Sequence, residues 1–167
     1  MTEPQASERQ AETLQRVGEY LSELFEDPFL DPENEHYYVG YGSTVLEVSV
    51  EPYGPEETIV RITAYCVQNV EMQSDLAIGL LELNHELPFG AFELVGGDIF
   101  CSHSLFGRGL NRNALLGAIA AVATTSDDYD DRIVAKYGGN TALELIRQTG
   151  GRKQRRSQGP DSAPDGD

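Results

Sequence analysis

The side chains that could bind a metal or carry out catalysis are few, and they do not converge. Cys101 and His103 are two residues apart, so both fall on one face of a predicted strand and could supply half of a zinc site. Only Cys66 could be added to it, because His36 falls in a loop and His85 near a helix end. The pattern favours buried thiols and a histidine satisfied within a sheet over a metal site.

No other stretch spells a cofactor-binding or catalytic motif. Tyr129 has aspartates on both sides, but the run lacks the glycine and the terminal glutamate of a calcium loop. On a helix, Tyr129 is expected to point inward, and the opposite, solvated side carries Asp127, Asp128, Asp130 and Asp131. The glycines fit neither GxGxxG nor GxxxxGK[ST], and residues 101–104 do not set a nucleophile against a base across a pocket. The sequence predicts no enzyme activity and no cofactor.

Charge narrows the classes of partner. The 167 residues carry a formal net charge of −16, with a pI near 4.4 and a mean hydropathy of −0.37. Such a chain repels nucleic acid and anionic membrane surfaces, and favours basic or apolar partners. No apolar run approaches the ~20 residues that span a bilayer. No signal segment is seen, and two cysteines without CxxC spacing suit a reducing compartment. These features predict a cytoplasmic protein.

The first half of the chain predicts a helix followed by strands. Ser7 and Gln10 have the spacing of a capping box, and an apolar helical stripe follows until Asp27 and Pro28 end it. Residues 28–36 predict a turn-rich connection. Alternating apolar residues predict strands over 37–51, with a bend near residues 40–42, and over 58–70. The short link between them predicts an antiparallel hairpin.

The second half predicts helix, hairpin and helix. Ser74 is the expected N-cap of a helix that Pro88 ends near residue 87. Gly96 and Gly97 predict a two-residue turn between strands near 91–95 and 98–105. The most self-consistent register puts residue 94 opposite 99 and residue 92 opposite 101, because one face is then entirely apolar.

A long helix is predicted from Asn111 to about residue 137, with a weak point at residues 124–126 and a stop at residues 138–139. Asn140 is then expected to cap a short helix. The basic patch at the end reads as a soluble tail, a contact with the chain's own acidic surface, or a weak nucleic-acid tether; it comprises Arg152, Lys153, Arg155 and Arg156. We therefore expect one domain over 7–149, with residues 1–6 and 150–167 disordered.

Three segments carry a family resemblance: YYVGYGSTVLEVSVEPYG, LLELNHELPFGAFELVGGDIFCSHSLFG and AVATTSDDYDDRIVAKYGG. Together they resemble the YbjN-type family, which is similar in fold to class I type III secretion chaperones such as CesT. The resemblance covers about residues 37–139. It implies an α+β fold, an antiparallel sheet with flanking helices in the order α-β-β-β-α-β-β-α, and often a homodimer. One extra strand is needed, and we expect it from a split near residues 40–42.

The resemblance brings no catalytic residues and implies a bacterial, chaperone-like module that binds a protein or peptide. Aromatic residues that the strand alternation cannot all bury are the expected partner-binding residues: Tyr37, Tyr38, Tyr41 and Phe106. An apolar or basic segment of another protein is the expected partner. The alternative is a regulatory subunit of the sensory-transduction type, acting through its own homodimer without a client; a small-molecule or metal sensor is a more distant one.

Overall fold

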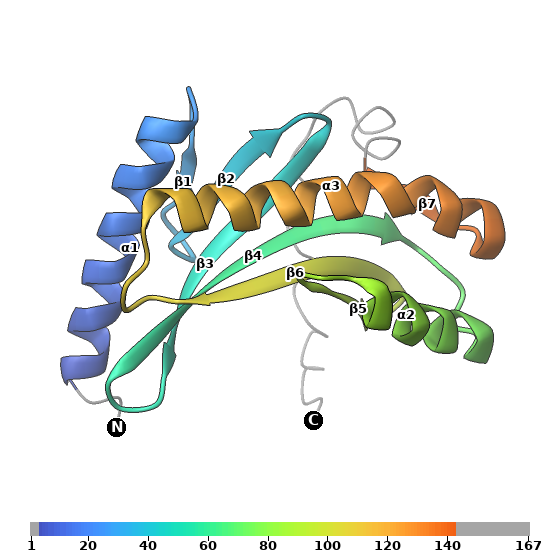
Figure 1. The fold of residues 1–167 in the computed structure, drawn as a ribbon, viewed down its shortest axis with the longest axis horizontal. Helices are drawn as coiled ribbons and strands as arrows, with labels where there is room; N and C mark the ends of the chain where they lie inside the picture. Colours follow the sequence, from blue (N-terminus) through green and yellow to red (C-terminus); the bar gives the residue numbers. More distant parts are fainter. Residues whose placement is uncertain (1–3, 143–167) are drawn as a thin grey trace, which may run out of the picture.

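The computed structural model describes residues 4–142, which form a curved antiparallel sheet with helices packed against it (Figure 1). The expected order of elements is confirmed, with short strands added after the first helix and at the end. The elements are α1 (Pro4–Leu24), β1 (Phe29–Asp31), β2 (His36–Tyr41), β3 (Thr44–Tyr53), β4 (Glu57–Gln68), α2 (Ser74–Glu86), β5 (Ala91–Val95), β6 (Asp98–Phe106), α3 (Arg112–Tyr137) and β7 (Asn140–Thr141).

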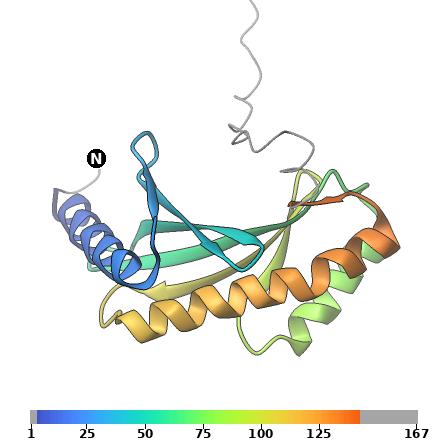
Figure 2. The same ribbon diagram turned by 90° about the horizontal axis from the view of Figure 1, so that it is seen from above.

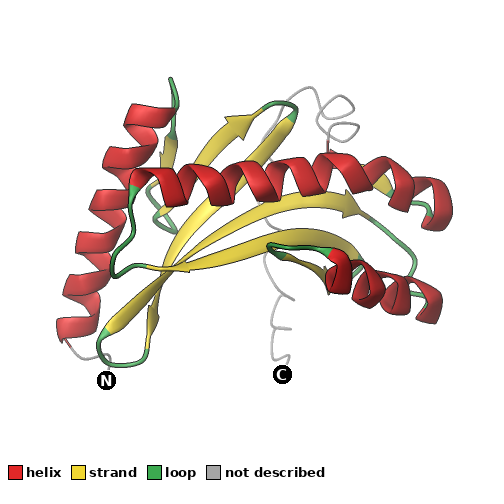
Figure 3. Cartoon of the chain, in the orientation of Figure 1, coloured by secondary structure: helices red, strands yellow, loops and turns green. Residues whose placement is uncertain are grey.

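The sheet has the strand order β1-β2-β3-β4-β6-β5, and β7 pairs with the far end of β4. The expected split gives β2 and β3, which turn through Gly42. Every pairing is antiparallel. Seen from above, the helices lie along one face of the sheet, and no described helix covers the other face (Figures 2 and 3). The α+β class is therefore confirmed, and its two sheet faces meet different surroundings.

The hydrophobic core fills the space between the sheet and the helices. Alternate residues of the central strands, such as Val48, Ile62 and Cys101, are fully buried, and α1 and α3 supply Val17 and Ile119 from above them. Full burial of an aliphatic side chain contributes about 1.5–3 kcal/mol relative to leaving it exposed. The period-two alternation of the strands thus decides which face the helices cover.

The predicted hairpin is confirmed. Val95 pairs with Asp98 and Leu94 with Ile99, as the apolar pattern indicates. Gly96 and Gly97 have φ values of +60° and +94°, which suit a turn that matches the twist of the strands. The carbonyl of Gly97 also accepts a 2.8 Å hydrogen bond from the Val70 amide, so the turn is tied to the segment that leaves β4.

Three expectations about helix ends are wrong. Residue 7 lies inside α1, which begins at Pro4, so there is no capping box at Ser7. The N-cap of α2 is Gln73, in extended geometry and without a side-chain hydrogen bond, and Ser74 is already helical. Asn140 does not cap a helix, because it pairs with Gln68 of β4 in β7; the chain is helical at Ala142, and the rest of the expected short helix lies outside the described residues. Tertiary packing and strand pairing override the local capping preferences at these positions.

The long helix behaves as predicted at its ends and not at its middle. The Asn111 side chain accepts a 3.0 Å hydrogen bond from the Ala114 amide, and Gly138 ends the helix with φ +79°. No break occurs at residues 124–126, because Ser126 is buried and its carbonyl accepts from the Cys66 thiol at 3.6 Å. β1 was also missed, since it lies in a stretch that reads as turns. Residues 143–167, including the basic patch, lie outside the described residues.

The hairpin turn gives a test of backbone strain. We expect Gly97→Val to lower the free energy of unfolding by about 1–3 kcal/mol, because a β-branched residue is strained at positive φ. Gly96→Asn is the matched control and should lower the free energy of unfolding by only about a few tenths of a kcal/mol, since Asn tolerates this geometry. Urea denaturation measures both, and equal costs for the two variants would contradict the assigned turn.

Candidate functional site

The two thiols are structural. Cys66 and Cys101 are both free and fully buried, and burial raises the pKa of each to about 12. A thiol that ionises so reluctantly is a poor nucleophile and a poor metal ligand. His103 packs edge-on against Phe89, with ring centroids 5.9 Å apart. Within residues 4–142, no group of three or more His, Cys, Asp or Glu side chains is arranged to hold a metal ion.

Of the four aspartates around Tyr129 on α3, Asp127, Asp128 and Asp131 are exposed and Asp130 is half-buried. The Tyr129 ring itself packs edge-on against Phe92 of β5, at 5.6 Å between centroids. Asp127 accepts a 2.5 Å hydrogen bond from the hydroxyl of Ser43, which ties the β2–β3 turn to α3. The inward tyrosine is thus as expected, and one of its flanking carboxylates has a structural role.

The face of the sheet that no described helix covers carries aromatic side chains in pairs. Tyr53 and Phe106 lie at one end with ring centroids 6.0 Å apart, and they are 57% and 61% exposed. Tyr65 and Phe100 form an edge-on pair at 4.8 Å toward the other end. Because β4 pairs with β3 and with β6, both pairs stand on the same face. We call this surface the open face.

Charged side chains occupy the middle of the open face. Arg61 of β4 lies between two carboxylates, 3.5 Å from Glu51 of β3 and 3.5 Å from Glu93 of β5. Glu93 also accepts a hydrogen bond from the Ser102 hydroxyl. These contacts hold the central side chains against the sheet and leave an excess of negative charge there.

A second polar group lies toward the β1 edge of the same face. Glu47 accepts a 2.8 Å hydrogen bond from the Tyr38 hydroxyl and lies 3.2 Å from Nδ1 of His36. Burial and the hydrogen bond to Glu47 raise the pKa of Tyr38 to about 12, so it stays a neutral donor at physiological pH. Its ring also lies 6.4 Å from that of Phe29 in β1. The tyrosine is therefore fixed in place and half-buried.

The structure does not bring the four expected partner-binding residues into one rim. Tyr38 and Phe106 are both on the open face, but β3 and β4 lie between their strands. Tyr37 packs on the opposite face against α1, where a Cβ added at Gly18 would lie 2.1 Å from its hydroxyl. Tyr41 follows the parity of Tyr37 and is 37% exposed at the end of β2.

Sequence reasoning missed Tyr53, Tyr65 and Phe100 as members of this surface. Strand alternation already puts Tyr65 with Arg61, and Phe100 with Ser102. What the sequence lacks is the pairing of β4 with β6, which joins the two sets into one face. That long-range contact has no local signature.

The outer edge of β5 is closed by a side chain. Asn84 of α2 donates from Nδ2 to the carbonyl of Phe92 at 3.1 Å and accepts from the Phe92 amide through Oδ1 at 2.6 Å. An exposed strand edge normally offers such groups to another strand. Here the asparagine takes the place of a partner strand at Phe92, the second of the five residues of β5, which disfavours addition of a client strand there.

A model of a known protein family matches most of this chain. The family is described as the type III secretion system (YopN, CesT) and YbjN peptide-binding chaperone 1, and its model matches residues 11–145. The chain belongs to this peptide-binding chaperone family. The resemblance read from the sequence is thereby confirmed. A comparison with curated proteins finds no match.

Solved structures share the fold of this chaperone family member. A chain of the ExsC–ExsE complex superposes with a TM-score of 0.57 at 9% identity, covering 73% of this chain and 93% of its own. A chain of the HopA1–SchA chaperone–effector complex gives 0.54 at 12% identity, covering 72% and 97%. An uncharacterized protein from Methanothermobacter thermautotrophicus gives 0.53 at 14%, covering 74% and 97%. At these identities the likeness concerns the fold alone. Of the helices described here, none has the length and apolarity needed to cross a membrane.

The closed edge of β5 gives a test of Asn84. We expect Asn84→Ala to lower the free energy of unfolding by about 1–3 kcal/mol, because it leaves the Phe92 amide and carbonyl without partners. Asn84→Asp keeps the acceptor and loses the donor, so its cost should be intermediate. Glu82→Ala, an exposed change on the same helix, is the control and should stay within about 0.5 kcal/mol. Chemical denaturation compares the three, and an Asn84→Ala variant as stable as the control would remove the edge-closing role.

Proposed function

We propose that this chain is a non-enzymatic, chaperone-like module that holds an extended segment of another protein on its open face. The observation that carries the proposal is the open face itself, with exposed Tyr53 and Phe106 at one end and the Tyr65–Phe100 pair at the other. Aromatic side chains give a large contact area at low cost in side-chain entropy. The peptide-binding description of the family supports the same conclusion.

The chemistry of the client follows from the charges on this face. Glu47, Glu51 and Glu93 all stand on it, while Arg61 is engaged by two of them. Opposite charge across an interface raises the association rate and selects against wrong partners. The client segment that fits is apolar with interspersed basic residues, and nucleic acid does not fit. Two buried free thiols suit a reducing compartment, and we place the protein in the cytoplasm.

We expect side-chain contacts on the open face, and not backbone pairing at a sheet edge, to supply most of the affinity for the client. Asn84 occupies the edge of β5 at Phe92, and β1 at the other edge has only three residues. Short edge strands offer little backbone for pairing. We therefore place the client across the open face, with Tyr38 and Phe106 among its contacts and Tyr37 and Tyr41 outside it.

Short unstructured peptides of leucine, glycine and serine, carrying either lysines or glutamates, test this function. We expect the lysine peptide to bind, with an on-rate that falls as salt rises. Tyr53→Ser combined with Phe106→Ser should weaken it by roughly tenfold or more, at about 1–2 kcal/mol for each lost aromatic contact. Fluorescence anisotropy measures binding, and circular dichroism checks the fold.

Tyr41→Ser is the matched control, because Tyr41 is an exposed aromatic residue on the other face of the sheet. It should bind the lysine peptide as the parent does. If the double variant binds as tightly as the parent, the client-binding proposal fails. The regulatory subunit that acts through its own dimer would then be the better account.

We further propose that the working assembly is a homodimer formed through α2. Its inward residues Leu76 and Leu80 are buried, while Ile78 and Leu81 are 55% and 69% exposed on its outer side. These two residues line a shallow hollow together with Glu82, His85 and Glu86. A second copy is the occupant that fits, because α2 lies away from the open face and the β5 edge beside it is closed by Asn84.

Sedimentation tests the dimer. At micromolar concentration we expect the parent at twice the chain mass of 18.3 kDa, and the Ile78→Glu, Leu81→Glu variant at 18.3 kDa. The reason is that two buried carboxylates in an apolar contact cost far more than the contact gains. Val45→Glu, which changes an exposed apolar residue of β3, should remain dimeric. A parent that sediments as a monomer, with α2 variants that lose peptide binding instead, would assign α2 to the client.

A further inference from the structure

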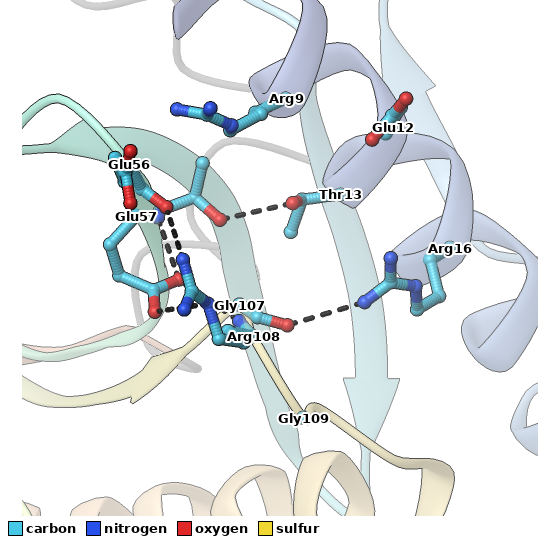
Figure 4. Close-up of a pocket in the computed structure, with 10 residues that line it drawn as sticks. Arg9, Glu12, Thr13, Arg16, Glu56, Glu57, Gly107, Arg108 and Gly109 are labelled. Carbon is cyan, nitrogen blue, oxygen red and sulfur yellow. Dashed lines mark hydrogen bonds and ion pairs between the residues drawn. The ribbon is translucent and has the colours of Figure 1, made fainter.

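A polar pocket lies apart from the open face, where α1 passes the turn between β3 and β4 and the turn between β6 and α3 (Figure 4). Its volume is about 390 Å³. Arginine side chains reach it from two segments far apart in the chain: Arg9 and Arg16 from α1, and Arg108 from the turn after β6. Glu12, Glu56 and Glu57 also line the pocket, so its formal charge is balanced, whereas the whole chain has 28 acidic and 12 basic residues.

The floor of the pocket is fixed by hydrogen bonds. The hydroxyls of Thr13 and Thr58 are both buried and lie 3.0 Å apart, joining α1 to β4. The Gly107 amide donates to the carbonyl of Thr58 at 2.7 Å. A Cβ at residue 107 would lie 2.0 Å from the Thr58 hydroxyl oxygen, so only glycine leaves this floor intact. These contacts therefore hold α1, β4 and the turn after β6 in fixed positions around the pocket.

Within the part of the chain that the structure describes, two of the three arginines have no carboxylate partner. Arg9 donates to the carbonyl of Pro55, and Arg16 donates to the carbonyl of Gly107 at 3.3 Å. No ion pair within 4.0 Å joins either guanidinium to a carboxylate among residues 4–142. A guanidinium has five N–H donors, so each of the two keeps donors for a ligand. Backbone carbonyls orient these side chains without neutralising them.

The three glutamates of the lining equal the arginines in number, but the ion pair among these lining residues joins Glu57 to Arg108 and involves neither Arg9 nor Arg16. Glu57 is committed, because its carboxylate accepts from the amides of Thr58 and Arg108 and lies 3.7 Å from the Arg108 guanidinium. The hydrogen bond from the Thr58 amide lowers the pKa of Glu57, so it stays ionised. Glu12 and Glu56 are exposed. Their negative charge opposes a doubly charged phosphate more strongly than a singly charged carboxylate.

We propose that this pocket binds a carboxylate presented by a polypeptide, with Arg9 and Arg16 as its donors. Arginine matches carboxylate geometry through paired N–H groups, and the pair is stronger than a neutral hydrogen bond. The carboxylate belongs to an aspartate or glutamate side chain or to a chain terminus. That the polypeptide is a client rests on the proposed function. An acid in this pocket then fixes the register of a segment whose apolar part lies on the open face.

Arginine side-chain NMR signals test the pocket directly. The probes are acetyl-Gly-Asp-Gly amide, its Asn counterpart, and acetyl-triglycine with a free or an amidated terminus. We expect saturable shifts of the Arg9 and Arg16 Nε–Hε signals with a carboxylate probe and none with either neutral probe. Binding of the aspartate peptide assigns the side-chain source, and binding of the free-acid triglycine assigns the terminus.

Variants decide whether the arginines carry the binding. In the parent, the Nε–Hε signal of Arg108, which lines the same pocket, should also shift with a carboxylate probe. Arg9→Gln with Arg16→Gln should abolish that shift, while Arg61→Gln, on the open face, should leave it unchanged. If the double variant does not fold, Arg9→Gln alone replaces it in the test. This variant removes one of the two arginines and should weaken binding several-fold. Equal shifts with the neutral probes, or full binding by a folded Arg9→Gln, Arg16→Gln variant, would overturn the proposal. If the lysine peptide binds but no carboxylate probe shifts the arginine signals, the carboxylate pocket is wrong while the proposed client-binding function is retained.

Discussion

The pairing of β4 with β3 on one side and β6 on the other is the interaction on which the rest of the structure depends. It sets which side chains share a face across β3, β4 and β6, although β6 follows β4 in the chain only after α2 and β5. Ile62 and Cys101 then meet the helices, while Arg61 and Phe100 meet solvent on the other side. A slip of one residue would exchange the two sets, so the apolar core and the open face are specified by the same register.

The helices contribute mainly by covering one face and leaving the other. α3 runs along the sheet as one unbroken element, and α1 stands at its end (Figure 1). Their apolar residues, such as Val17 and Ile119, complete the core. Because the core is complete on that side, stability does not require the open face to be buried, and its residues are free to serve recognition.

Elements that rest on local patterns could be predicted from the sequence. The hairpin at Gly96 and Gly97 follows from alternation and turn chemistry, and the cap at Asn111 follows from its side chain. Elements that depend on distant partners could not. β1 is too short to show alternation, and Ser126 looks like a weak helix position until its burial beside Cys66 is seen. The arginine pocket draws on residues 9, 16 and 108, which only the folded chain brings together.

The same reason separates the two sets of candidate residues. Tyr37 and Tyr38 are adjacent in sequence, yet strand geometry sends one against α1 and the other to the open face. Composition alone cannot distinguish them, whereas the register with β3 can. Their split explains why an aromatic-rich strand serves both the core and the surface.

Asn84 has a consequence for how such a protein stays in solution. A protein that binds extended segments, as proposed above, would meet many of them, and a free sheet edge would let those segments, or neighbouring copies, stack into ordered aggregates. By occupying the amide and carbonyl of Phe92, the Asn84 side chain interrupts that edge near the start of β5. Binding is then left to surfaces that make contacts through side chains. Such contacts can be broken without starting a fibril.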